Sequence, residues 1–68
     1  MNYFSENLLY YRKKRGMTQN DLARKVFVKR QTISNYEKNT RICDLDTLVL
    51  LSEALDISLD DLIKNPHP

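Results

Sequence analysis

Two short stretches of the chain decide its fold: MTQNDLA at residues 17–23 and RQTISNYE at residues 30–37. In both, apolar residues recur at helical spacing and not in the strict alternation of a half-buried strand. Thr18, with Asp21 three positions later, has the pattern of a capping box, which marks where a helix begins. Residues 27–29 leave room for only a tight connection. The two stretches therefore predict a pair of short helices joined by a tight turn.

A longer helix is expected before this pair, from Phe4 to Arg15. Phe4, Leu8 and Tyr11 recur at intervals of four and three residues and mark its buried stripe. Cations crowd its last turn, where they oppose the negative end of the helix dipole. Gly16, the only glycine of the chain, follows at the position where a left-handed backbone ends a helix at least cost.

Two further helices are expected in the second half of the chain. Asp44 is a suitable N-cap for the first, and leucines follow it at helical spacing: Leu45, Leu48, Leu51 and Leu55. Ser58 and Asp61 repeat the capping-box pattern, which predicts a short fifth helix over residues 59–64. The sequence thus predicts an all-α, compact five-helix domain over residues 1–64, followed by a disordered tail over residues 65–68. The inner faces of its second and third helices would carry Leu22, Ala23, Val26, Ile33 and Tyr36.

Length and composition exclude several classes of protein. A chain of 68 residues forms one domain with a small core. Its one cysteine, Cys43, excludes an internal disulfide and suits the reducing cytoplasm. With His67 as the only histidine, no metal site, cofactor or enzymatic activity is expected. No apolar run approaches the roughly 20 residues that span a bilayer, and neither a membrane nor a small-molecule partner is expected.

Charge is distributed unevenly along the chain. Residues 1–41 contain ten Lys/Arg and three acids, a net charge of +7, whereas residues 42–68 contain one base and six acids, a net charge of −5. Such asymmetry indicates one face for a polyanion and one end that avoids it. An ordinary solvated surface is the alternative interpretation of charge alone.

These motifs resemble the lambda-repressor-like helix-turn-helix family, which includes the Cro and Xre regulators. The similarity extends from Phe4 to Ile63. It is carried by Met17-Thr18-Gln19 with Asp21-Leu22-Ala23, by Thr32-Ile33-Ser34 with Tyr36-Glu37, by Leu45-Asp46-Thr47-Leu48 and by Ser58-Leu59-Asp60-Asp61-Leu62. The resemblance implies a sequence-specific regulator of transcription, a repressor by the simplest mechanism, which binds double-stranded DNA. Its recognition helix, about residues 30–38, would lie in the major groove.

The side chains that open this helix suit base edges. The forked guanidinium of Arg30 matches O6 and N7 of guanine, and the amide of Gln31 matches the donor and acceptor of adenine. Asn35 lies four residues past Gln31 and extends the same helical face. The resemblance adds Ser34 to the base-facing set and Thr32 as a contact to a thymine methyl group.

Phosphate contacts are expected around the recognition helix. Gln19 opens the preceding helix, where free backbone N–H groups favour an anion, and the resemblance places this glutamine against a phosphate. The flanking polar residues are expected to clamp the DNA backbone: Lys29, Lys38, Asn39 and Arg41.

The resemblance also implies an ion pair between Arg12 and Glu37. A bidentate pair would set the angle of the recognition helix and hold Arg12 near a phosphate; two unrelated surface charges are the alternative. Two positions at the turn and at the start of the recognition helix depart from the family pattern. Phe27 stands where the family turn usually has glycine or asparagine, a position that often takes positive φ, so either the turn differs or Phe27 accepts the strain and gains burial. Lys29 replaces the usual Ser/Thr cap and cannot accept a backbone hydrogen bond, so the recognition helix should begin less firmly.

Apolar residues stand where the family more often has polar ones: Leu9, Tyr10, Val49 and Leu50. An exposed apolar cluster marks a contact surface, and local burial is the alternative. Relatives dimerise through their C-terminal helices, so the resemblance implies a homodimer with an interface formed by Val49, Leu50, Leu59 and Ile63. The two recognition helices would then lie about 34 Å apart and read a near-palindrome.

A second function stays open at this point. The chain could be a protein-interaction module, such as an antitoxin or an adaptor, that keeps the helix-turn-helix fold. In that case its apolar surface would matter more than Arg30 and Gln31.

Overall fold

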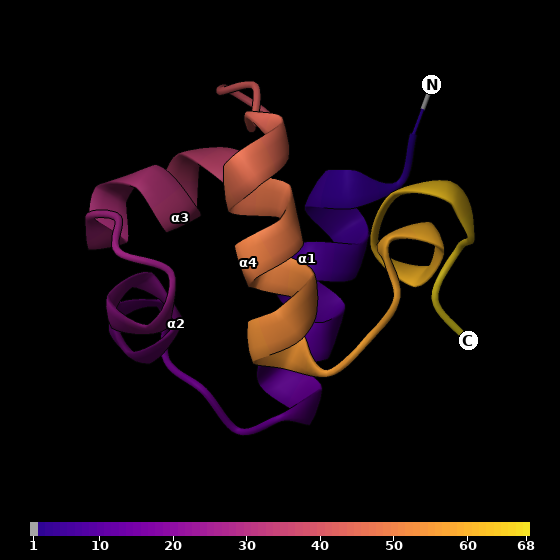
Figure 1. Cartoon of the computed structure of the whole chain (residues 1–68), viewed down its shortest axis with the longest axis horizontal. Coiled ribbons are helices and arrows are strands. Elements are labelled where there is room, and N and C mark those ends of the chain that lie inside the picture. The colour runs from indigo at the N-terminus through magenta and orange to yellow at the C-terminus, as the bar shows by residue number, and fades with distance from the viewer. Residues whose placement is uncertain (1) are drawn as a thin grey trace.

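A computed structural model describes residues 2–68 and consists of helices joined by short links (Figure 1). The helices are α1 (Phe4–Lys14), α2 (Gln19–Lys25), α3 (Arg30–Glu37), α4 (Leu45–Leu55) and the π-helix η1 (Asp60–Lys64). The all-α architecture and the order of five helices expected from the sequence are confirmed. No helix among the described residues has the length and apolar character needed to cross a bilayer.

The end of α1 and the start of α2 carry the signals that the sequence predicts. The hydroxyl of Thr18 accepts from the backbone N–H of Asp21, and the carboxylate of Asp21 accepts from the N–H of Thr18, both at 3.0 Å. This reciprocal capping box fixes the start of α2. Gly16 has φ of 70° just after α1.

The side chain of Arg15 donates through Nε to the carbonyl of Leu55 at 2.8 Å and so caps the C-terminal end of α4.

One apolar core joins all the helices. Its fully buried aliphatic side chains come from each of them: Leu8, Leu22, Val26, Ile33, Leu51, Leu55 and Leu62. Phe4 packs edge-to-face on Tyr36 with ring centroids 5.7 Å apart, which ties the start of α1 to α3. Because α3 packs on both α1 and α2, its outer face is held in a fixed orientation.

Leu45 and Phe27 contradict the predicted burial pattern. Leu45 is 68% exposed although its spacing predicts that it lies on the inner face of α4. It is the first residue of that helix, so the rest of the molecule does not extend over it. Phe27 does adopt positive φ, 62°, but it is 84% exposed, so the expected gain in burial is wrong.

The C-terminal helix forms where the sequence predicts one, but its hydrogen bonding is that of a π-helix. The hydroxyl of Ser58 accepts from the N–H of Asp61, and the N–H of Asn65 donates to the carbonyl of Asp60, five residues earlier. The buried amide of Asn7 donates from Nδ2 to the carbonyls of Asp61, Leu62 and Asn65. Asn7 therefore attaches η1 to α1 by satisfying carbonyl groups at the end of the helix.

The tail over residues 65–68, for which the sequence predicts disorder, lies back against α1. The ring of His67 stacks on Tyr10 with centroids 4.4 Å apart and planes inclined by 7°. This contact covers one face of an aromatic ring that belongs to the apolar cluster expected at the surface.

Candidate nucleic-acid interface

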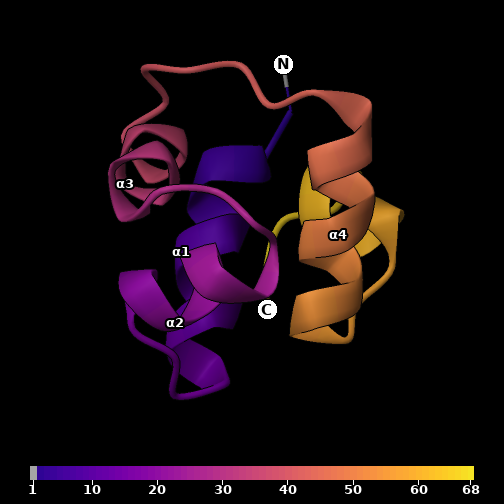
Figure 2. The same cartoon turned by 60° about the vertical axis from the view of Figure 1, so that its left-hand side comes forward.

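The outer face of α3 presents polar side chains to solvent. Figures 1 and 2 place α2 and α3 together on one side of the molecule, with η1 on the other. Arg30 and Gln31 are exposed in the first turn of α3, and Thr32 and Asn35 are half-buried. Ser34 is only 7% exposed and lies on the packed side of the helix, which argues against the base contact expected of it.

Gln31 and Asn35 form a local pair on this face. The Gln31 amide donates from Nε2 to Oδ1 of Asn35 at 3.1 Å, one helical turn away. Because Lys29 provides no side-chain cap, the first turn of α3 lacks the acceptor that begins α2, as the sequence predicts.

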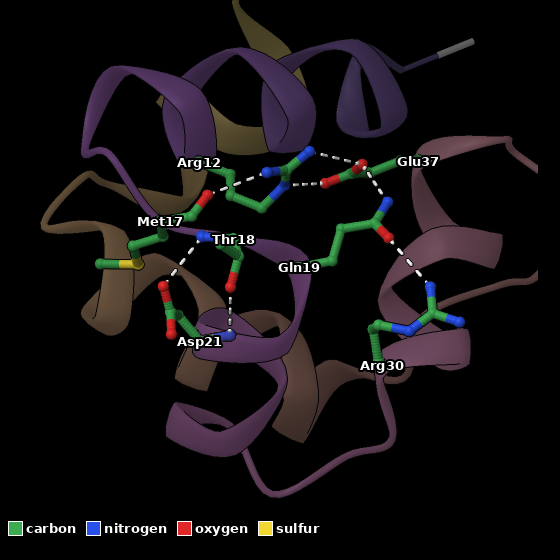
Figure 3. A network of polar contacts seen from close by, with 7 residues as sticks. All are labelled: Arg12, Met17, Thr18, Gln19, Asp21, Arg30 and Glu37. Atoms are coloured by element: carbon green, nitrogen blue, oxygen red, sulfur yellow. Dashed lines mark hydrogen bonds and ion pairs between the residues drawn. The ribbon is translucent and has the colours of Figure 1, made fainter.

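An ion pair connects the last turn of α1 to the end of α3 (Figure 3). The guanidinium of Arg12 donates from Nε and Nη2 to the two oxygens of Glu37, at 2.5 and 3.1 Å, and from Nη1 to the carbonyl of Met17 at 2.9 Å. The two side chains are 10% and 6% exposed. Arg12 is thus bound within the protein on all three nitrogens, which argues against the phosphate contact expected of it.

Gln19 extends this pair towards the exposed face. Its amide donates from Nε2 to Oε1 of Glu37 at 2.9 Å and accepts at Oε1 from Nη1 of Arg30 at 3.3 Å. Figure 3 shows the resulting chain of contacts from Arg12 through Glu37 and Gln19 to Arg30. The sequence suggests the Arg12–Glu37 contact only by resemblance, and it does not indicate that Gln19 lies between Glu37 and Arg30. No local sequence pattern reports such a meeting of three helices.

The residues expected to clamp phosphates lie around α3 and are accessible. Lys29 precedes the helix, and Lys38, Asn39 and Arg41 follow it; all four are exposed. Asn39 has φ of 59°, a conformation that asparagine tolerates better than most residues. Within residues 2–68, no salt bridge involves the three cations of this set, so their charges are available to a polyanion.

Two neutral side chains lie on the packed side of α3 and in the link that follows it: Tyr36 and Cys43. Burial raises the pKa of Tyr36 to about 12, with a hydrogen bond to Cys43 adding to the shift. Burial likewise raises the pKa of the Cys43 thiol to about 11. Both groups therefore stay protonated near neutral pH and place no negative charge under the basic face. The described residues contain no cluster of three or more side chains suited to a metal ion.

The residues expected to form a dimer interface are partly accessible. Val49 is 37% exposed, and Leu50, Leu59 and Ile63 are half-buried, with Leu50 and Ile63 packed against the core. Sequence reasoning missed Ile42, which is 93% exposed in the link between α3 and α4. Its apolar character is visible in the sequence, but a single apolar residue in a link carries no periodicity.

Comparison with known proteins agrees with this geometry. A family model described as "Helix-turn-helix" matches residues 8–62, which include α2, the turn and α3. The chain belongs to this helix-turn-helix family. It is 43% identical over 61 residues to the uncharacterized HTH-type transcriptional regulator YqaE of Bacillus subtilis, covering 90% of this chain and 53% of that protein. It is 38% identical over 48 residues to the antitoxin HipB of Escherichia coli K12, covering 71% of this chain and 54% of that protein.

The same helix-turn-helix fold occurs in solved structures. The P22 c2 repressor in complex with a synthetic operator aligns with a TM-score of 0.87 and 32% identity, covering 93% of this chain and 96% of that one. The chain spans about half the length of the curated relatives that it matches.

Proposed function

We propose that this chain is a sequence-specific regulator of transcription that binds double-stranded DNA through α3 and acts as a repressor. The observation that most supports this function is the exposed first turn of α3, where Arg30 and Gln31 project into solvent. An α-helix fits the major groove, and arginine and glutamine are suited to guanine and adenine edges. The similarity to the P22 c2 repressor, whose structure contains an operator, supports this assignment. In this proposal the protein is not an enzyme and acts in the cytoplasm.

The contacts divide into two kinds. Arg30, Gln31 and Asn35 would contact base edges. Thr32, beside them, would contact a thymine methyl group. The exposed residues on either side of α3 would hold the DNA backbone, which positions the helix without reading sequence: Lys29, Lys38, Asn39 and Arg41. This division predicts that two variables affect binding independently: base substitutions in the DNA site and the salt concentration.

A second copy of the chain is part of the proposal. A homodimer through Val49 and Leu50 of α4 and through Leu59 and Ile63 would present two α3 helices to one side of a duplex. Half-sites would then be separated by about 34 Å, one turn of the DNA helix. In-vitro selection from a random pool of duplexes is expected to return a near-palindrome with that spacing.

Substitution of the two proposed base-reading residues tests the function. With an operator obtained by selection, Arg30→Ala and Gln31→Ala should each weaken binding and remove preference at one base pair, at a cost of about 1–3 kcal/mol. Arg24→Ala is the matched control, because Arg24 is an exposed arginine outside α3. Affinity and base preference that stay unchanged in both α3 variants would refute the assignment.

A protein-interaction role is the second candidate. It is favoured by the similarity to the antitoxin HipB and by apolar side chains that the fold leaves exposed, of which Phe27 and Ile42 are the most accessible. Capture of a stoichiometric protein partner, together with DNA binding that is nonspecific and abolished by moderate salt, would favour this function over the first.

A further inference from the structure

A cavity of about 320 Å³ lies between the N-terminal end of the chain and the link that joins α3 to α4. Figure 2 shows this link passing the N-terminal end. The cavity is lined by Asn2 and Phe4, by residues 39–43, by Leu48 of α4 and by Ile63 of η1. These segments are far apart in the sequence, so no local pattern indicates the cavity. Its volume lies within the range of small-molecule sites, roughly 300–1,000 Å³.

Contacts within the protein hold the walls of the cavity in place. The backbone N–H of Tyr3 donates to the carbonyl of Ile63 at 3.0 Å, which fixes the N-terminal end against η1. The carbonyl of Asn35 accepts from the backbone N–H of Thr40 at 2.9 Å and from its hydroxyl at 3.1 Å, which fixes the start of the link to α3. The cavity is therefore formed before any ligand binds, as most small-molecule sites are.

The inner wall of the cavity is apolar and uncharged. Phe4 is buried, and Leu48 and Ile63 pack against the core. Cys43 also lines the wall, and burial raises the pKa of its thiol to about 11, so the thiol is neutral near neutral pH. Ile42 lines the cavity too and is exposed, so a ligand there would cover part of its surface. Such a wall favours a hydrocarbon chain.

Arg41 gives the cavity a single positive charge. Among the described residues that line the cavity it is the only charged one, and its exposed side chain forms no salt bridge within residues 2–68. Burial raises the pKa of Tyr36 and of Cys43, and the charge of Arg41 opposes both shifts, so its field reaches the wall. The nearby acid Asp44 is exposed and does not line the cavity. A guanidinium in this position suits a carboxylate, which it can bind with two parallel hydrogen bonds.

We propose that this cavity binds a small monocarboxylate with an apolar tail. The hydrocarbon tail lies against Phe4, Leu48 and Ile63, and the carboxylate pairs with Arg41. An uncharged chain would leave the guanidinium without a partner, and an anion without a tail would leave the apolar wall uncovered.

The consequence for DNA rests on the function proposed above. Asn39 and Arg41 line the cavity and are also expected to hold phosphates of the DNA backbone. A carboxylate on Arg41 neutralises a charge that the DNA would otherwise use, so the bound ligand weakens DNA binding. The ligand would thus act as an inducer that competes with DNA for one side chain.

Titration of the free protein with octanoate, octanol and acetate tests the site, by calorimetry and by the chemical shifts of the Leu48 and Ile63 methyl groups. Octanoate should bind, and the two probes that each lack one half of it should bind about tenfold more weakly or less. Arg41→Gln should weaken octanoate binding about tenfold and leave octanol unaffected. Arg24→Gln is the matched control, because it removes an exposed arginine that does not line the cavity.

Three results would overturn the site. The first is equal affinity of Arg41→Gln and Arg24→Gln for octanoate, and the second is a set of shifted signals that excludes the cavity. The third is octanoate affinity that falls as the protein concentration rises, which would show that a second copy of the chain covers the cavity.

A DNA-binding measurement tests the competition separately. Octanoate should weaken the binding of the wild type to a selected operator and have little effect on Arg41→Gln at the same concentration. An operator affinity that saturating octanoate leaves unchanged would overturn the competition for Arg41. A wild-type protein without base preference would refute the proposed function and the competition with it, whereas the titrations of the free protein would still decide the site.

Discussion

The backbone of Phe27 has φ of 62° in the turn between α2 and α3, and its side chain is 84% exposed. In this region the Cβ atom crowds the following carbonyl oxygen, which costs roughly 1–2 kcal/mol. Phe27→Gly removes the Cβ atom and loses almost no buried surface. We expect relief of this strain to raise the free energy of unfolding by about 1 kcal/mol. Part of this gain is offset, because glycine has greater conformational entropy in the unfolded chain. Chemical denaturation of the two proteins measures the difference.

Phe27→Ala is the matched control at this residue. Alanine keeps the Cβ atom and discards the ring, so its stability should stay close to that of the wild type if strain and not the ring matters. A Phe27→Gly protein that is less stable than Phe27→Ala would contradict this account, because the two variants differ only in the Cβ atom. A Phe27→Ala protein that is less stable than the wild type would show that the exposed ring contributes to the fold.

The Arg12–Glu37 ion pair fixes the position of α3 on α1. Both side chains are at most 10% exposed, so removal of one partner leaves a buried charge without its counter-ion. Arg12→Met should therefore destabilise the protein by about 3–5 kcal/mol. The Arg24–Asp21 pair is the internal comparison, because its side chains are 73% and 42% exposed. Arg24→Met should cost less than about 1 kcal/mol.

Thermal unfolding at low and high salt distinguishes the two pairs. Water and ions screen the exposed pair, whereas the Arg12–Glu37 contact should change little with ionic strength. Similar costs for the two substitutions would mean that the connection between α1 and α3 depends on apolar packing alone.

The helices are predictable from the sequence because their signals are local. Thr18 and Asp21 encode the start of α2, and Gly16 the end of α1, through contacts within a few residues. The exposure of Leu45 is not predictable, since periodicity gives the face of a helix but not how far its neighbours extend over the first turn. The position of Gln19 between Glu37 and Arg30 depends on how three helices pack, which no local pattern contains.

For the molecule as a whole, the distribution of charge should matter more than the net charge of +2. The basic residues that flank α3 lie in the half of the chain with a net charge of +7, and Lys64 is the only base of the other half. Lys38→Gln and Arg41→Gln should each lower the log–log slope of affinity against salt by about 0.9 for every phosphate that the variant no longer neutralises. Lys64→Gln removes the same charge far along the chain and should leave the slope unchanged. If all three variants lowered the slope equally, DNA would respond to the overall charge of the protein, and the phosphate clamp around α3 would be disproved.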